Sequence, residues 1–157
     1  MTSVPRSFRT GDGVFLVGGV PEVLARVRPH LELLAKHIYY FGPLGSGNIA
    51  KIAKNSINAI ERIALSEVIA IAEAGGLQVR DFLDMAVATD QGSAVARWER
   101  AFAIQDNHAL PRPASNVLNK DIGLAADLAK ASGLKSPITQ AAADIAKVWV
   151  AGWETAK

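Results

Sequence analysis

The chain has 157 residues, half of them hydrophobic and a fifth charged, and this composition is ordinary for one soluble globular domain. It contains no cysteine, which excludes disulfides, thiolate metal sites and a cysteine nucleophile, and its three histidines are too widely spaced to predict a metal site. Because the net charge is only +2 and no apolar run approaches the roughly 20 residues that span a bilayer, we expect neither nucleic-acid nor membrane binding, and we expect the protein in the cytoplasm.

The first part of the chain predicts a short strand–helix–strand unit. Residues 1–12 are polar and are expected to form a flexible N-terminus. The apolar runs VFLVGG (14–19) and HIYYFG (37–42) are typical of buried strands, and the helix expected between them should bend or break at Pro29. Residues 13–42 therefore predict a parallel βαβ unit, the remnant of a Rossmann-type domain. Two parallel strands are too few to be stable alone, so we expect a neighbour beside them.

From residue 43 the pattern becomes helical. Isoleucine and alanine recur at intervals of three and four from Asn48 to Ala72, and Gly75-Gly76 supplies a left-handed helix end. A helix over 48–74 would be about 40 Å long, a length suited to joining two domains or crossing a dimer. Further helices are predicted at 79–88, 92–103, 115–131 and 137–151. The expected fold class is mainly α, with the βαβ remnant followed by a long helix and an all-helical domain over 43–157.

The stretch GPLGSGNIAKIAKN (42–55) is the first that could carry chemistry. Lys51 and Asn55 lie four residues apart and would share a helix face, near a helix N-terminus that favours anions. The glycines around Ser46 would let an anion approach the backbone. The alternative is structural: a glycine-rich linker with Ser46 as the N-cap, followed by a lysine on a solvated face. The spacing does not match a P-loop.

The stretch NKDIGLAADLA (119–129) is the second stretch that could carry chemistry. By itself it is an alanine-rich packing face of a helix, with Lys120 and Asp121 as a surface charge pair.

Together, the two stretches resemble the β-hydroxyacid dehydrogenase family, which includes 3-hydroxyisobutyrate dehydrogenase, tartronate semialdehyde reductase and 6-phosphogluconate dehydrogenase. The catalytic motif GxxGxGxxxKxxxN is matched at every fixed position, by Gly42, Gly45, Gly47, Lys51 and Asn55. The cofactor-side motif KDLGxAxD is matched, with isoleucine for leucine, by Lys120, Asp121, Ile122, Gly123, Ala125 and Asp127. The resemblance covers about residues 13–145 and implies that residues 43–157 form a catalytic and dimerisation domain.

The resemblance implies a role for each matched residue. Lys51 would be the general acid/base at the substrate oxygen, and Asn55 would orient Lys51 or bind the substrate. The residues expected to bind the substrate are Gly45, Ser46 and Gly47, and those expected to lie near NAD or NADP are Lys120 and Asp127. The GxGxxG stretch of the family's nucleotide-binding domain does not occur in this chain, so whether the chain alone is an enzyme is left open.

Three functions remain as hypotheses. The first is the C-terminal catalytic half of an NAD(P)-dependent 3-hydroxyacid dehydrogenase, incomplete by itself, which acts on a small hydroxyacid or semialdehyde as a homodimer. The second is a degenerate, non-catalytic helical dimerisation module. The third is a small-anion-binding protein that uses the helix start at Gly45–Gly47.

Overall fold

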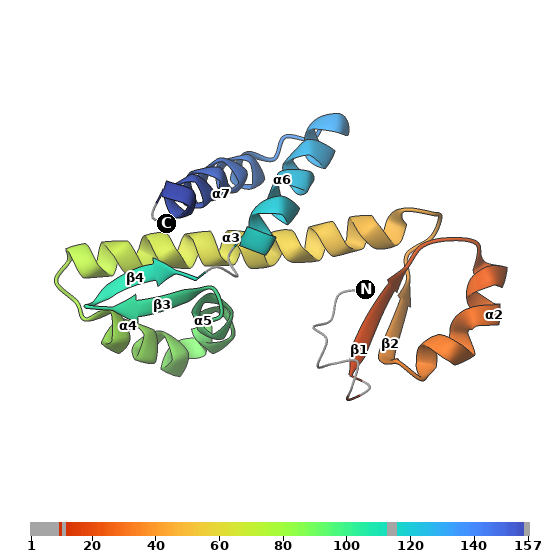
Figure 1. Cartoon of the computed structure of the whole chain (residues 1–157), viewed down its shortest axis with the longest axis horizontal. Coiled ribbons are helices and arrows are strands. Elements are labelled where there is room, and N and C mark those ends of the chain that lie inside the picture. The colour runs from red at the N-terminus through yellow and green to blue at the C-terminus, as the bar shows by residue number, and fades with distance from the viewer. Residues whose placement is uncertain (1–9, 11, 113–115, 156–157) are drawn as a thin grey trace. The chain divides into compact units, whose positions relative to one another are not determined.

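The computed structural model describes residues 10, 12–112 and 116–155, and for 116–118 and 149–155 it describes the backbone only (Figure 1). The chain forms two compact units, Met1–Lys54 and Asn55–Lys157. Helix α3 (Ser46–Ala74) begins in the first unit and continues into the second. The mainly α fold class is confirmed. None of the described helices is both long and apolar enough to cross a membrane.

The first unit is the predicted βαβ element. Strand β1 (Gly13–Val17) pairs in parallel with β2 (Ala35–Tyr40), so that Phe15 lies opposite Ile38. Each strand lies one or two residues earlier than predicted. Helix α2 (Pro21–Glu32) connects the strands, and it does not break at Pro29. Proline is tolerated there because Pro29 lies in the last turn, where its missing N–H removes a single hydrogen bond from a helix that is about to end.

The side chains of the first unit bury little apolar surface. Among its described residues, Leu24 and Ala35 are the buried hydrophobic side chains, whereas Val23, Tyr39 and Phe41 are exposed. A two-stranded parallel sheet with so small a core is weak by itself. That a further element lies beside these strands stays a prediction.

The end of β1 and the start of α3 make a close contact within the first unit. A Cβ atom placed on Gly47 would lie 2.5 Å from the carbonyl oxygen of Leu16, and one on Gly18 would lie 2.6 Å from that of Pro43. Both distances are far inside van der Waals contact, so only glycine fits at either position. Gly47 therefore has a packing role, because its missing side chain lets α3 approach β1.

The second unit is built around the remainder of α3. This helix ends as predicted, with Gly76 at φ 87° and the N–H of Leu77 donating to the carbonyl of Ala72 at 3.0 Å. The elements that follow are α4 (Val79–Ala86), a kink at Val87–Gln91, α5 (Gly92–Glu99), β3 (Phe102–Gln105), β4 (His108–Pro111), α6 (Asn116–Ala131) and α7 (Pro137–Thr155).

The hairpin of β3 and β4 was not predicted, and the helix expected over 92–103 ends at Glu99. Asp106 and Asn107 take left-handed φ values of 49° and 66°, as a two-residue hairpin turn requires. The Asn107 side chain accepts a 2.8 Å hydrogen bond from the N–H of Val79. The turn of the hairpin therefore caps the first turn of α4.

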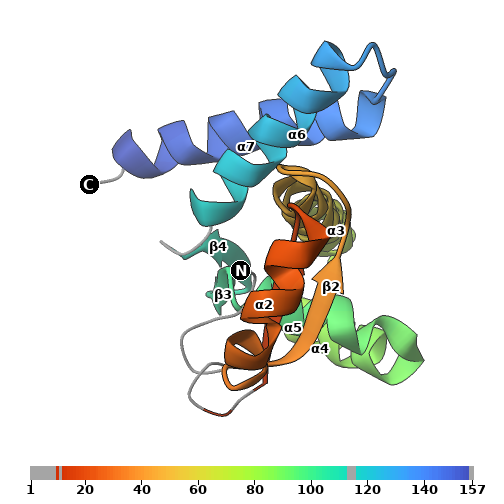
Figure 2. The same cartoon turned by 90° about the vertical axis from the view of Figure 1, so that its right-hand side faces the viewer.

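Two separate cores lie against α3 in this unit, and Figures 1 and 2 show α6 and α7 on one side of the helix and α4, α5 and the hairpin on the other. Trp98 is fully buried in the core formed with α4, α5 and the hairpin, where its ring stacks on Phe102 with centroids 4.9 Å apart. The core on the α6–α7 side consists of Ala59, Ile63, Ile122, Ala126, Ala142, Ala143 and Ala146. Its alanines allow these three helices to pack closely.

Replacement of Gly47 by alanine tests the contact between β1 and α3. Because the new methyl group would overlap the Leu16 carbonyl, Gly47→Ala should lower the free energy of unfolding by about 1–3 kcal/mol. Gly123→Ala is the matched control, since a Cβ at this helical glycine meets no atom within 4 Å and should raise stability by about 0.5–1 kcal/mol. Urea denaturation followed by circular dichroism measures both, and a neutral Gly47→Ala would contradict the contact.

Candidate functional site

The loop before α3 is shaped by glycines. Gly42 and Gly45 have φ values of 112° and 96°, a left-handed region that favours glycine. The N–H of Ser46 donates to the carbonyl of Pro43 at 3.1 Å, and the N–H of Ile49 donates to that of Gly45 at 3.1 Å. The carbonyl of Gly45 thus accepts the first helical hydrogen bond, which makes Gly45 the N-cap residue of α3.

The side chain of Ser46 does not serve as the cap that the structural alternative predicted. Its Oγ atom is shielded from solvent and has no hydrogen-bond partner among the described residues. A buried hydroxyl without a partner is uncommon and requires an explanation. This oxygen is therefore the polar atom of the Gly45–Gly47 segment that remains to be satisfied.

Lys51 lies on the second turn of α3 and is half-buried. The structure records no hydrogen bond or ion pair from its ammonium group to any described residue. Asn55 follows one turn later on the same helix, as the spacing predicted.

Asn55 connects the two stretches that the sequence singled out. Its Nδ2 donates a hydrogen bond of 2.5 Å to Oδ2 of Asp121, across a separation of 66 residues in the chain. The predicted surface charge pair of Lys120 and Asp121 is therefore wrong, because Asp121 is half-buried and turned toward α3. Asp121 had no assigned role in the sequence motif, and its partner is too distant in the chain for spacing to reveal.

Helix α6 presents its two predicted cofactor-side residues to solvent. Ile122 is fully buried and Ala126 is 8% exposed, so these two residues face the core. Lys120 and Asp127 are exposed, two helical turns apart. The ammonium group of Lys120 has no ion-pair partner among the described residues and could contact an anionic group of a bound cofactor.

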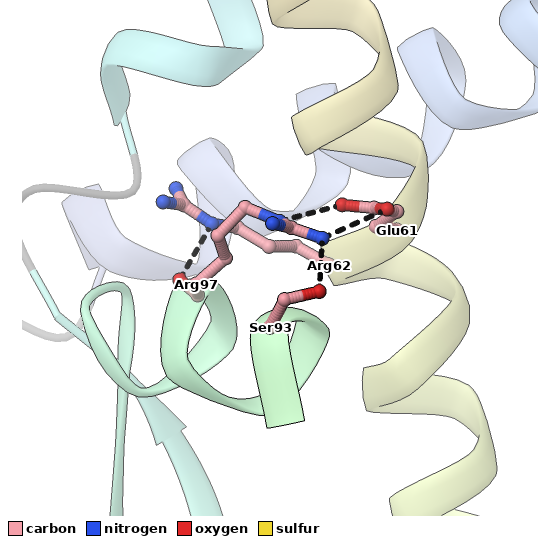
Figure 3. Close-up of polar contacts among 4 residues, drawn as sticks. All are labelled: Glu61, Arg62, Ser93 and Arg97. Carbon is pink, nitrogen blue, oxygen red and sulfur yellow. Dashed lines mark hydrogen bonds and ion pairs between the residues drawn. The ribbon is translucent and has the colours of Figure 1, made fainter. Parts of the chain in front are cut away.

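A polar cluster between α3 and α5 was also missed from the sequence (Figure 3). Arg97 donates from Nε and Nη2 to the two carboxylate oxygens of Glu61, at 2.7 and 3.0 Å. Arg62 donates from Nε to the carbonyl oxygen of Arg97 at 2.9 Å. Burial, followed by the charges of Arg100 and Arg97, lowers the pKa of Arg62 from its usual value. The residues that meet here lie 35 and 36 positions apart in the chain and so leave no local signal in the sequence.

Comparison with known proteins places the chain in a protein family. A family profile described as "NAD-binding of NADP-dependent 3-hydroxyisobutyrate dehydrogenase" matches residues 45–156. The match covers residues 45–55 of the first stretch and all of the second.

Individual relatives agree with the profile. A probable 3-hydroxyisobutyrate dehydrogenase of Mycobacterium bovis is 34% identical over 145 residues, which cover 83% of this chain and 47% of the relative. An NAD-dependent L-serine dehydrogenase of Pseudomonas aeruginosa is 29% identical, over 82% of this chain and 45% of that protein. The solved structure of Mycobacterium tuberculosis 3-hydroxyisobutyrate dehydrogenase with L-serine superimposes with a TM-score of 0.73 at 28% identity, over 93% of this chain and 52% of that one. The chain thus spans about half the length of these relatives.

A double-mutant cycle measures the bond between Asn55 and Asp121. Hydrogen bonds to a charged group contribute about 1.5–3 kcal/mol, so Asn55→Ala and Asp121→Ala should each lower the free energy of unfolding, and the double variant should lose less than their sum. We expect a coupling energy of about 1–2 kcal/mol from urea denaturation. Strict additivity would show that the two side chains do not interact in solution.

Proposed function

Because this chain belongs to the β-hydroxyacid dehydrogenase family, we propose that it supplies the proton-transfer residues for reversible hydride transfer between a nicotinamide cofactor and a small hydroxyacid or semialdehyde. The observation that carries the proposal is the hydrogen bond from Asn55 to Asp121, since it joins the catalytic stretch to the cofactor-side stretch. The relatives are named for activity toward 3-hydroxyisobutyrate and L-serine, and both of these compounds are small 3-hydroxyacids.

Lys51 is the general acid/base in this proposal. As a carbonyl substrate is reduced, negative charge develops on its oxygen, and the ammonium group of Lys51 donates a proton there. In the oxidation direction the neutral amine accepts the hydroxyl proton. The proposal is supported by the half-buried position of Lys51 and by the lack of a competing carboxylate among its described neighbours.

Asn55 and Asp121 position the reacting groups. A carboxylate that accepts from Nδ2 selects one of the two orientations of the Asn55 amide. The acceptor oxygen of the amide is then held in a fixed direction, for Lys51 or for the substrate. Asp121 acts through Asn55 in this scheme and is a positioning residue.

The start of α3 is the proposed site for the substrate carboxylate. The positive end of a helix attracts anions, and Gly45, Ser46 and Gly47 form that end of α3. NAD or NADP would supply or accept the hydride. Exposed Lys120, together with Asp127, fits the edge of such a cofactor, because its ammonium group is not neutralised by a described carboxylate.

We further propose that the chain forms a homodimer and works in the cytoplasm. Helix α3 exposes Ile57, Val68 and Ile71, the last to 70%, and a row of exposed aliphatic side chains favours association. Sedimentation velocity would test the oligomeric state, and a monomer at all concentrations would exclude the dimer.

Titration with NADH and with NADPH, followed by nicotinamide fluorescence, tests the cofactor site. Saturable binding is expected, weakened at least tenfold by Lys120→Ala, because the variant removes a cation beside the cofactor. Lys130→Ala is the matched control, since Lys130 is an exposed lysine on the same helix, and it should bind as the unaltered chain does. No binding of either nucleotide would favour the non-catalytic dimerisation module.

Turnover of 3-hydroxyisobutyrate and of L-serine tests Lys51. General acid–base groups contribute about 10²–10⁴-fold, so Lys51→Met should lower kcat by about 100-fold or more while cofactor binding is retained. Lys54→Met, one turn along α3, should retain activity. Equal activity of both variants would remove Lys51 from the mechanism, and inactivity of the unaltered chain would contradict catalysis by this chain alone.

A further inference from the structure

The polar cluster between α3 and α5 holds more positive than negative charge. Hydrogen bonds join Glu61 and Arg62 on α3 to Arg97 on α5. Arg100, immediately after α5, is near enough for its charge to act on Arg62 and lower its pKa. Glu61 is the acidic residue of the cluster, and both of its carboxylate oxygens accept from Arg97 (Figure 3). Arg62 and Arg100 therefore have no carboxylate partner among the described residues.

The guanidinium group of Arg62 is fixed at one edge and open at the other. Its Nε donates to the carbonyl oxygen of Arg97, in the last turn of α5. This carbonyl accepts no helical hydrogen bond from Ala101, because the N–H of Ala101 donates to the carbonyl of Trp98 instead. The terminal nitrogens of Arg62 lie on the side away from Glu61 (Figure 3). The recorded side-chain hydrogen bond of Arg62 to a described residue comes from Nε. Two parallel N–H groups of this kind match the two oxygens of a carboxylate or phosphate.

The backbone that carries Arg62 is also held in place. Ser66 Oγ donates to the Arg62 carbonyl at 2.9 Å and accepts from Nε1 of the fully buried Trp98 at 2.8 Å. A fixed, half-buried guanidinium that is repelled by two neighbouring arginines is a prepared partner for an anion, and these conditions are also the cause of the lowered pKa of Arg62.

We propose that Arg62 and Arg100 form a binding site for the carboxylate or phosphate group of a small molecule. Arg62 binds the group through its two terminal nitrogens, and Arg100 supplies a second positive charge. The site shares no residue with the proposed hydride-transfer machinery, so its test does not depend on the proposed function. Capping of α5 does not by itself explain the position of Arg62, because the cap uses only its Nε and not its two terminal nitrogens.

Isothermal titration with inorganic phosphate, and separately with acetate, at constant ionic strength tests the site. Saturable binding of at least one probe is expected, and which probe binds more tightly distinguishes a phosphate site from a carboxylate site. Arg100→Gln should weaken binding at least fivefold, and Arg62→Gln should abolish it. Arg112→Gln is the matched control and should change affinity less than twofold. Arg112 also donates its Nε to a carbonyl, that of Phe102, at 2.8 Å, but it shares a small cavity with the carboxylate of Glu99.

Arg62→Gln removes a helix cap and could unfold the α5 region, so the Arg100 variant decides the question. Arg100 is exposed and makes no recorded hydrogen bond, and its variant should keep the circular dichroism spectrum of the unaltered chain. The proposal is overturned if neither probe binds saturably, or if Arg112→Gln weakens binding as much as Arg100→Gln does.

Discussion

Helix α3 is the constraint on which the second unit depends. A 29-residue helix is not stable in water through its own hydrogen bonds alone, and packing of its apolar residues must hold it. Ala59 and Ile63 pack toward α6 and α7, while Ile69 packs toward α4, α5 and the hairpin. Because one continuous helix serves both cores, the spacing of its polar residues is fixed as well. Asn55 therefore meets its partner on α6, whereas Arg62 and Ser66 meet theirs on α5.

Packing also decides which polar residues of α6 can act. Burial of an isoleucine side chain contributes about 1.5–3 kcal/mol, and Ile122 is fully buried. With Ile122 and Ala126 directed inward, the helical period places Asp121 at the edge of the core and Lys120 in solvent. The hydrogen bond from Asn55 to Asp121 is thus permitted by the apolar contacts and adds to them. Lys120 and Asp121 are therefore in different surroundings, since Asp121 accepts from Asn55 and Lys120 is exposed.

The signals in the sequence were reliable where a residue type forces the backbone. Gly75-Gly76 predicted the end of α3, and two short apolar runs with a helix between them predicted the parallel pairing of β1 and β2. The hairpin was missed because its strands have four residues each, and because Asp106-Asn107 is a weaker turn signal than a pair containing glycine. For the candidate site, the sequence predicted which residues belong to the two motifs but not which residues they contact. Neither the partner of Asn55 nor that of Arg62 could be found, since each bond joins segments that only tertiary packing brings together.

The ion pair of Glu61 and Arg97 is not required to hold α5 on α3. Its side chains are 35% and 29% exposed, and pairs with this much solvent contact contribute about 0–1 kcal/mol. The fully buried Trp98, Ile69 and Leu83 supply far more through apolar burial. A cluster of three arginines beside such a core adds mutual repulsion and little stability. Glu61 neutralises Arg97, and an anion bound at the proposed site would offset the remaining repulsion between Arg62 and Arg100.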